Sequence, residues 1–151
     1  MKMIIVYDTK YGNAKRIAET IGDGAKGVAG TEVEVSHVRD VDPGQLAGYD
    51  AIVVGSPTHM ARPLRSVKKL IRNMAAQPLQ GKVVAAFETW GSAPGRGLAR
   101  TEGYLKEIAG VTLVAPGLSA KVGGVKGPLL DEELPKSRDF GTKIAQHSAQ
   151  G

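Results

Sequence analysis

The chain has 151 residues, of which 42% are hydrophobic, and its 20 Lys and Arg against 15 Asp and Glu give a formal net charge of +5. This length and composition predict a single domain, residues 1–151, with one sizeable core. The absence of cysteine excludes disulfides, a thiolate nucleophile and cysteine-ligated metals, and no apolar run approaches the roughly 20 residues of a membrane span. The few aromatic residues, 5%, argue against a base-stacking platform for nucleic acid. We expect a cytoplasmic protein with no membrane span and no nucleic-acid partner.

The first strand and helix surround a short polar loop. Three branched apolar residues at 4–6 predict a strand buried on both faces, as in a parallel sheet. After the loop, Ile17, Ala18 and Ile21 lie at helical spacing, in a helix expected to end near Gly27 or Gly30. The free N–H groups and the positive end of the helix dipole make this loop an anion site, most naturally for phosphate. An ordinary strand-to-helix turn is an equally weighted alternative.

The rest of the chain repeats this alternation. Residues 31–36 alternate with period two and predict a half-exposed strand at a sheet edge, and Asp42-Pro43-Gly44 starts a short helix or turn. Buried strands are predicted for residues 51–55 and 83–87, followed by a last clear strand at 111–114. The apolar spacing predicts further helices at 64–74, 98–108 and 131 to about 147, with an irregular crossing at 117–128.

Five alternations of strand and helix predict a doubly wound α/β fold, with a five-stranded parallel sheet and helices on both faces. Ligands of such sheets bind outside the carboxyl ends of the strands. Three loops leave such ends, at residues 8–14, 56–62 and 88–97. We therefore expect these loops to converge on one site.

Three stretches carry a resemblance to a known family: residues 6–13 (VYDTKYGN), 54–58 (VGSPT) and 87–92 (FETWGS). Together with residues 140–145 they resemble flavodoxin, in particular the flavodoxin-like domain of the A-type flavoproteins (flavodiiron proteins). Here the domain would stand free, in a short-chain form. The resemblance implies a flavodoxin-like fold and FMN as the cofactor.

The resemblance also implies where FMN binds. The first loop would wrap the phosphate, and the other two loops would lie on either side of the isoalloxazine ring, with the single tryptophan beside it. The implied FMN-binding residues are Thr9, Lys10, Tyr11, Gly12, Asn13, Ala14, Pro57, Thr58, His59, Met60, Glu88, Thr89, Trp90, Gly91, Gly95 and Gly97. No catalytic residue and no metal site is expected, because no general acid, base or nucleophile is convincing.

The chain departs from the flavodoxin pattern at two places. Tyr11 and Ala14 stand where flavodoxins usually carry hydroxyl residues, which removes two donors to the phosphate. The loop 58–62 has no glycine, which puts in doubt the backbone flip that serves reduced flavin in the family. The positive net charge, with Arg62 and Arg96 in the flanking loops, favours a less negative potential for forming fully reduced flavin.

These features predict an FMN-binding electron carrier that meets redox partner proteins with acidic docking faces, as a monomer or weak dimer. Whether the protein is an enzyme stays open, although a carrier is favoured over a self-sufficient enzyme. One alternative is an FMN-dependent oxidoreductase of quinone or protoporphyrinogen reductase type, which the positive charge and the missing glycine favour slightly. Another is a flavin-free binding module, for which Tyr11 and Ala14 are the best support.

Overall fold

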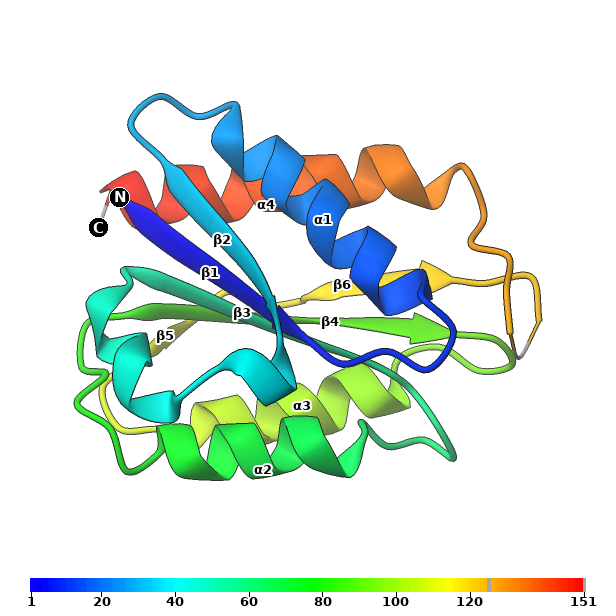
Figure 1. Ribbon diagram of the computed structural model, residues 1–151, viewed down its shortest axis with the longest axis horizontal. Helices are drawn as coiled ribbons and strands as arrows, with labels where there is room; N and C mark the ends of the chain where they lie inside the picture. Colours follow the sequence, from blue (N-terminus) through cyan, green and yellow to red (C-terminus); the bar gives the residue numbers. More distant parts are fainter. Residues whose placement is uncertain (125, 151) are drawn as a thin grey trace.

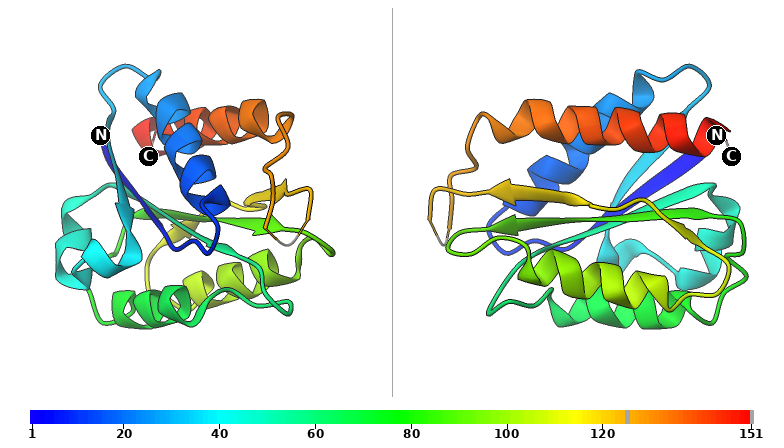
Figure 2. Two further views of the ribbon diagram at one scale, coloured as in Figure 1. Left: turned by 45° about the vertical axis from the view of Figure 1, so that its right-hand side comes forward. Right: turned by 180° about the vertical axis from the view of Figure 1, so that it is seen from behind.

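The computed structural model describes residues 1–124 and 126–150 as three layers, with a parallel sheet between two pairs of helices (Figure 1; Figure 2). The strands are β1 (Lys2–Tyr7), β2 (Glu32–His37), β3 (Ala51–Pro57), β4 (Val83–Trp90), β5 (Thr112–Leu113) and β6 (Leu118–Lys121). The helices are α1 (Asn13–Lys26), α2 (Arg65–Met74), α3 (Arg96–Lys106) and α4 (Glu133–Gln150), with short 3₁₀ helices η1 (Val38–Asp40) and η2 (Pro43–Gly48).

The strand order is β2-β1-β3-β4-β5, with β6 also paired to β4, and every pairing is parallel. The predicted doubly wound sheet is therefore confirmed, including the half-exposed edge strand β2. β5 and β6 share one edge of β4: β5 pairs with its start and β6 with residues Phe87 to Trp90. They occupy the place of a single fifth strand that is broken in the middle.

Two expectations about the sheet were wrong. The segment 117–128 is not wholly irregular, because it contains β6. Residues 88–90 belong to β4 and residues 56–57 to β3, and not to the loops that follow, because β6 pairs with the end of β4 and β4 with the end of β3. A strand continues as far as its neighbours pair with it, and this pairing is invisible in the local sequence.

The core has two halves because alternate residues of each strand point to opposite faces. Ile5, Val53 and Phe87 pack under α1 and α4, whereas Ile4, Val54 and Ala86 pack over α2, α3 and η2. The carboxyl ends of β1, β3, β4 and β6 lie at one end of the molecule, and the start of β1 and the end of α4 lie at the other (Figure 1). The loops expected to form a site therefore meet at a single edge of the sheet.

Candidate functional site

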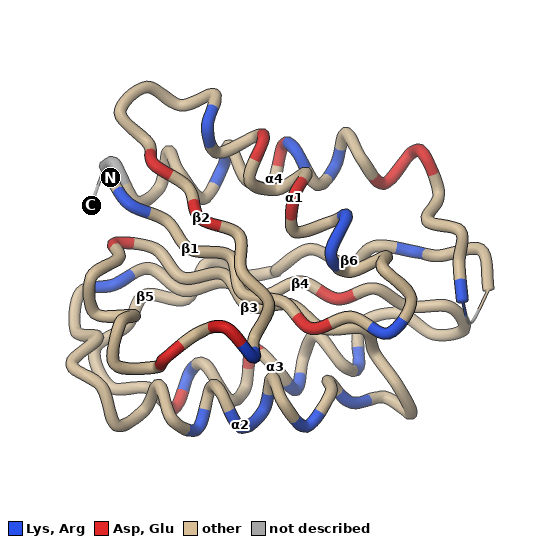
Figure 3. The backbone as a smooth tube through the Cα atoms, in the orientation of Figure 1, with Lys and Arg blue, Asp and Glu red and all other residues tan. Residues whose placement is uncertain are grey.

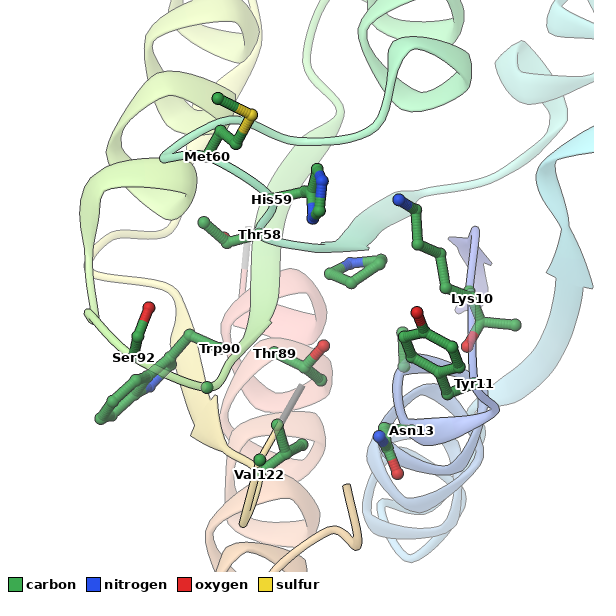
Figure 4. A pocket seen from close by; sticks show the side chains of 15 residues that line it. Lys10, Tyr11, Asn13, Thr58, His59, Met60, Thr89, Trp90, Ser92 and Val122 are labelled. Carbon is green, nitrogen blue, oxygen red and sulfur yellow. The ribbon is translucent and has the colours of Figure 1, made fainter. Parts of the chain in front are cut away.

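A cavity of about 470 Å³ opens at the carboxyl ends of β1, β3 and β4. This volume lies within the range of small-molecule and cofactor sites. Figure 4 shows Lys10, Tyr11 and Asn13 on one side of the cavity and Trp90 and Ser92 on the other, with Thr58 and His59 between them. The cavity is thus built from all three loops.

The first wall is the loop from β1 to α1, which ends in an uncapped helix. Gly12 occupies the N-cap position with φ of 90°, and no side chain caps α1. The Gly12 N–H donates to Thr9 Oγ1 (2.9 Å), so the hydroxyl proton of Thr9 remains available to a ligand. An uncapped helix start next to a cavity offers backbone N–H groups and the positive end of the dipole to an anion.

Asp8 fixes the beginning of this wall from behind. Its Oδ1 accepts the Thr9 N–H (2.7 Å) and lies 3.1 Å from Nε2 of His37, while Oδ2 accepts the hydroxyl of Ser66. Nδ1 of His37 accepts the Arg39 N–H (3.1 Å), which leaves Nε2 as the nitrogen that donates to Asp8. The end of β1 is therefore held from β2 on one side and from α2 on the other.

The second wall is the loop between β3 and α2, which turns sharply at Met60 and Ala61. His59 and Arg62 exchange backbone hydrogen bonds of 2.9 and 3.1 Å across the turn. Met60 and Ala61 have φ of 52° and 64°, a left-handed conformation that costs a residue with a Cβ roughly 1–2 kcal/mol. The loop thus makes without glycine a turn that usually employs it. Met60 itself is 86% exposed.

The third wall combines the end of β4 with the chain that leaves β6. The Val122 N–H donates to the Trp90 carbonyl (2.9 Å), and Nζ of Lys121 lies 5.5 Å from the Trp90 ring centre. Further along, the Lys126 carbonyl accepts from the Asn13 side-chain amide (3.2 Å), and Nζ of Lys126 lies 5.9 Å from the Tyr11 ring centre. This segment therefore contacts both the tryptophan wall and the anion loop.

Glu88 lies beneath the cavity and does not line it. Its carboxylate, 1% exposed, accepts from the Thr58 hydroxyl (2.6 Å), the Ser119 hydroxyl (2.6 Å), and the backbone N–H groups of Gly95 (2.7 Å) and Leu98 (3.3 Å). The last two belong to the N-cap and first turn of α3, so Glu88 caps that helix from the neighbouring strand. A Cβ on Gly97 would lie 2.0 Å from Thr58 Oγ1, so glycine there lets Thr58 approach Glu88.

Twelve of the sixteen residues expected at the FMN site line the cavity. The other four do not: Gly12 shapes the anion loop, and Glu88, Gly95 and Gly97 form the buried joint beneath the cavity. Three lining residues fell outside the expected set, namely Ser92, Val122 and Gly124. The Gly123-Gly124 pair was the available sequence signal for the last of these.

The titratable group whose pKa is clearly shifted, Tyr49, lies away from the cavity. Donation of the Tyr49 hydroxyl to the Glu34 carboxylate raises the pKa of Tyr49 to about 12, with smaller contributions from burial and from the Glu34 charge. Within residues 1–124 and 126–150, no group of three or more His, Asp or Glu side chains is placed to hold a metal ion. No helix in the same part of the chain is both long enough and apolar enough to cross a bilayer.

Comparison with known proteins agrees with this geometry. A family model described as a flavodoxin domain matches residues 4–115. The chain belongs to the flavodoxin family. Among curated flavodoxins, that of Aquifex aeolicus (strain VF5) is 27% identical over 158 residues, covering 96% of this chain and 85% of the relative.

Other similar proteins include a quinone reductase, a solved flavodoxin and a flavodiiron protein. An NAD(P)H dehydrogenase (quinone) of Chromohalobacter salexigens is 32% identical over 119 residues, which cover 62% of this chain and 59% of that protein. A solved flavodoxin from the domain Archaea covers 99% of both chains at 31% identity, with a TM-score of 0.87. The Flv1 flavodiiron core of Synechocystis sp. PCC6803 covers 99% of this chain and 36% of that one at 19% identity, with a TM-score of 0.82. The expected likeness to flavodiiron proteins is thus confirmed as a likeness of fold.

Proposed function

We propose that this flavodoxin-family chain binds FMN in the cavity and carries electrons between redox proteins. The observation that carries the proposal is the uncapped start of α1, with Gly12 in a left-handed conformation, opening onto a cavity of about 470 Å³. The donor set fits a phosphate at that end, and the Trp90 ring on the far wall of the cavity fits a flat aromatic ring beside it. FMN, when bound, supplies one- and two-electron chemistry.

The chain's own residues would hold and orient the cofactor. The Thr9 hydroxyl and the first N–H groups of α1 would bind the phosphate, and Lys10 would add a positive charge at the same end. The strained turn at Met60 and Ala61 would border the ring on one side, opposite Trp90. Because this turn already adopts positive φ without glycine, the backbone beside the ring is preset.

The positive charge of the chain shapes two further parts of the proposal. Cations around the cavity favour the anionic, fully reduced flavin, so we expect the potential for its formation to be less negative than in acidic flavodoxins. Partners are expected to be redox proteins with acidic docking faces, met in the cytoplasm by a monomer or weak dimer. Potentiometric titration of the FMN-loaded protein tests the first point, and a strongly negative second potential would contradict it.

A second function, an FMN-dependent quinone reductase, is favoured by one observation: the 32% identity to an NAD(P)H dehydrogenase (quinone). The two functions differ in what the protein does alone. A carrier leaves NADH, NADPH and a soluble quinone unchanged without partner proteins, whereas a reductase turns them over. Steady consumption of NAD(P)H by the purified, FMN-loaded protein would replace the carrier function with the reductase.

The test of FMN binding is the visible absorption spectrum and flavin fluorescence of the purified protein, before and after FMN is added. Gly12→Ala puts a Cβ on a residue with φ of 90° in the anion loop, and should weaken FMN binding about tenfold or more. Gly30→Ala is the matched control, because Gly30 also has positive φ (79°), meets nothing within 4 Å and lies outside the cavity lining. We expect both variants to lose similar stability and only Gly12→Ala to lose FMN affinity.

A wild-type spectrum that excess FMN leaves unchanged would reject the proposal and favour the flavin-free binding module. Equal losses of FMN affinity in Gly12→Ala and Gly30→Ala would instead show that the phosphate does not bind at the start of α1.

A further inference from the structure

The net positive charge of the chain is concentrated in one helix layer. α2 carries Arg65, Lys68, Lys69 and Arg72 with no acidic residue, and α3 carries three cations and one glutamate. This leaves 13 Lys and Arg against 14 Asp and Glu in the rest of the chain. Figure 3 shows blue segments following one another along α2 and mostly blue along α3, whereas both colours occur along α1 and α4. We call the seven cations the α2–α3 basic face: Arg65, Lys68, Lys69, Arg72, Arg96, Arg100 and Lys106.

The charges of the α2–α3 basic face are not neutralised by the protein itself. All seven side chains are exposed. Among the described residues, the ion pair joins Lys136 to Glu133, and neither it nor the contact of His37 with Asp8 uses a cation of this face. The one glutamate of α3, Glu102, is turned inward and accepts the Gly117 N–H (2.9 Å). An exposed, unpaired surface of one sign repels itself and attracts a complementary one.

The face is shaped to receive protein side chains. A groove of about 220 Å³ lies between α2 and the end of α3, and it is lined by Ile71, Ala75 and Tyr104, by the cations Lys68 and Arg72, and by one carboxylate, that of Glu107. Nζ of Lys68 lies 5.3 Å from the Tyr104 ring centre. Such a groove suits an apolar side chain with a carboxylate beside it, because its apolar lining lies next to two cations on α2, which outnumber the one carboxylate of Glu107.

The face also reaches the mouth of the cavity. Arg96 begins α3 and lines a smaller hollow together with Met60, Ala61 and Trp90, two of which also line the main cavity. A partner seated on the N-terminal halves of α2 and α3 would therefore also cover the mouth where the flavin is proposed to lie. We infer that the α2–α3 basic face is the docking surface for an acidic redox protein, an inference that rests on the carrier function proposed above.

Two other polyanions fit the face less well. The exposed large apolar residues among those described, Tyr11 and Met60, lie at the cavity, so the outer faces of α2 and α3 carry no group to insert into a lipid bilayer. Tyr104, its aromatic residue, is half-buried beneath Lys68 and offers no platform for stacking nucleic-acid bases. An acidic protein surface can follow both the helices and the cavity mouth.

The test is a nuclear magnetic resonance titration of the ¹⁵N-labelled full chain with a small acidic rubredoxin at low ionic strength. We expect amide shifts along α2 and α3 and in the loops 58–64 and 91–95, which disappear as salt is added. Shifts confined to α1 and α4, or no shifts at low salt, would overturn the inference. Anionic lipid vesicles and duplex DNA are titrated in parallel, and tighter binding of either would replace the acidic protein as the occupant.

Paired variants separate this face from a general effect of charge. Arg65→Gln/Arg100→Gln removes two cations of the face, and Lys26→Gln/Lys143→Gln removes two exposed cations from the opposite helix layer. We expect the first to weaken rubredoxin binding about tenfold and the second to change it less than twofold. Equal weakening of rubredoxin binding by the two double variants would reject the α2–α3 basic face as the docking surface. None of the four residues lines the cavity, so FMN binding should be unchanged in both variants.

The titration does not need bound flavin, so the two proposals fail separately. Rubredoxin contacts on α2 and α3 in a chain that takes up no FMN would keep the docking face and reject the carrier. FMN uptake with contacts elsewhere would keep the carrier and reject the face.

Discussion

α1 and α4 meet backbone to backbone, whereas α2 and α3 are separated by side chains and a groove. A Cβ added at Gly24 would lie 1.9 Å from the Arg138 carbonyl oxygen, and one at Gly141 would lie 1.9 Å from the Ile21 carbonyl oxygen. The Thr142 hydroxyl also donates to the Gly24 carbonyl (3.1 Å). On the other face of the sheet, no such contact brings α2 to α3, and α3 is fastened instead by the carboxylate of Glu88.

The difference separates two tasks of the molecule. Close packing leaves α1 little freedom to move against α4, so the anion loop that begins α1 is held in place. The second layer packs on the sheet through apolar side chains and the polar contacts of Glu88, and its outer surface is left free to carry charge. The same sheet thus carries a closely packed helix layer that holds the anion loop and a second helix layer whose outer surface is basic.

The largest expected effect comes from removing the polar contact of the second layer. Glu88→Ala leaves two hydroxyls and two backbone N–H groups without their buried acceptor, and should lower the free energy of unfolding by about 3–5 kcal/mol. Glu88→Gln keeps one acceptor oxygen and should lose about 1–2 kcal/mol. Urea unfolding followed by circular dichroism measures both, and a Glu88→Ala loss below about 1 kcal/mol would show that the joint is not held by this carboxylate.

Replacing one glycine by alanine in each helix layer tests whether the two layers differ in how closely they pack. Gly24→Ala forces the new Cβ into the backbone of α4, and should lower the free energy of unfolding by about 2–3 kcal/mol despite the better helix propensity of alanine. Gly103→Ala is the matched control on α3, where a Cβ meets nothing within 4 Å, and should raise stability by about 0.5–1 kcal/mol. If both variants were stabilised, the two layers would not differ in packing.

Local sequence patterns predicted the elements well where the burial of the segment itself sets the pattern of apolar residues. Runs such as Ile4-Ile5-Val6 are apolar on both faces because both helix layers cover them. β6 was missed because its four residues include Ser119 and Lys121 and depend on β4 for their pairing. A short strand with polar residues carries too little periodicity to be recognised alone.

The sequence predicted which loops form the site, but not which of their residues line the cavity and which lie buried beneath it. Glu88 occupies the same place in the sequence whether it faces a ligand or the interior, and its donors Thr58 and Ser119 lie 30 and 31 residues away. The basic face was hidden for a similar reason. Its cations are spread over residues 65–106 in the sequence, and only the packing of α2 beside α3 brings them together.

The two layers also differ in how their helices begin, which a smaller stability change can measure. α1 follows Gly12, for which positive φ is inexpensive, whereas the loop into α2 places Ala61 at φ of 64°. Ala61→Gly relieves this strain and should raise stability by about 0.5–1 kcal/mol. Ala29→Gly, in an exposed turn without positive φ at that residue, should instead lose up to about 1 kcal/mol. A loss for Ala61→Gly would contradict the strained turn.

The smallest effect concerns Tyr49, which packs against the α2 side of the core and donates to Glu34 at the sheet edge. Its pKa is raised from 10.0 to about 12, so the folded chain holds this proton more tightly than the unfolded chain does. The stabilisation is therefore present below pH 10 and is lost as the pH rises from about 10 to about 12. We expect wild type to be slightly more stable than Tyr49→Phe at pH 9 and the difference to vanish near pH 12, in urea unfolding at matched ionic strength. A stability difference that stays constant across this pH range would mean that Tyr49 stabilises the fold by packing alone. The hydrogen bond to Glu34 would then contribute nothing to the second layer, which would still be held by the contacts of Glu88.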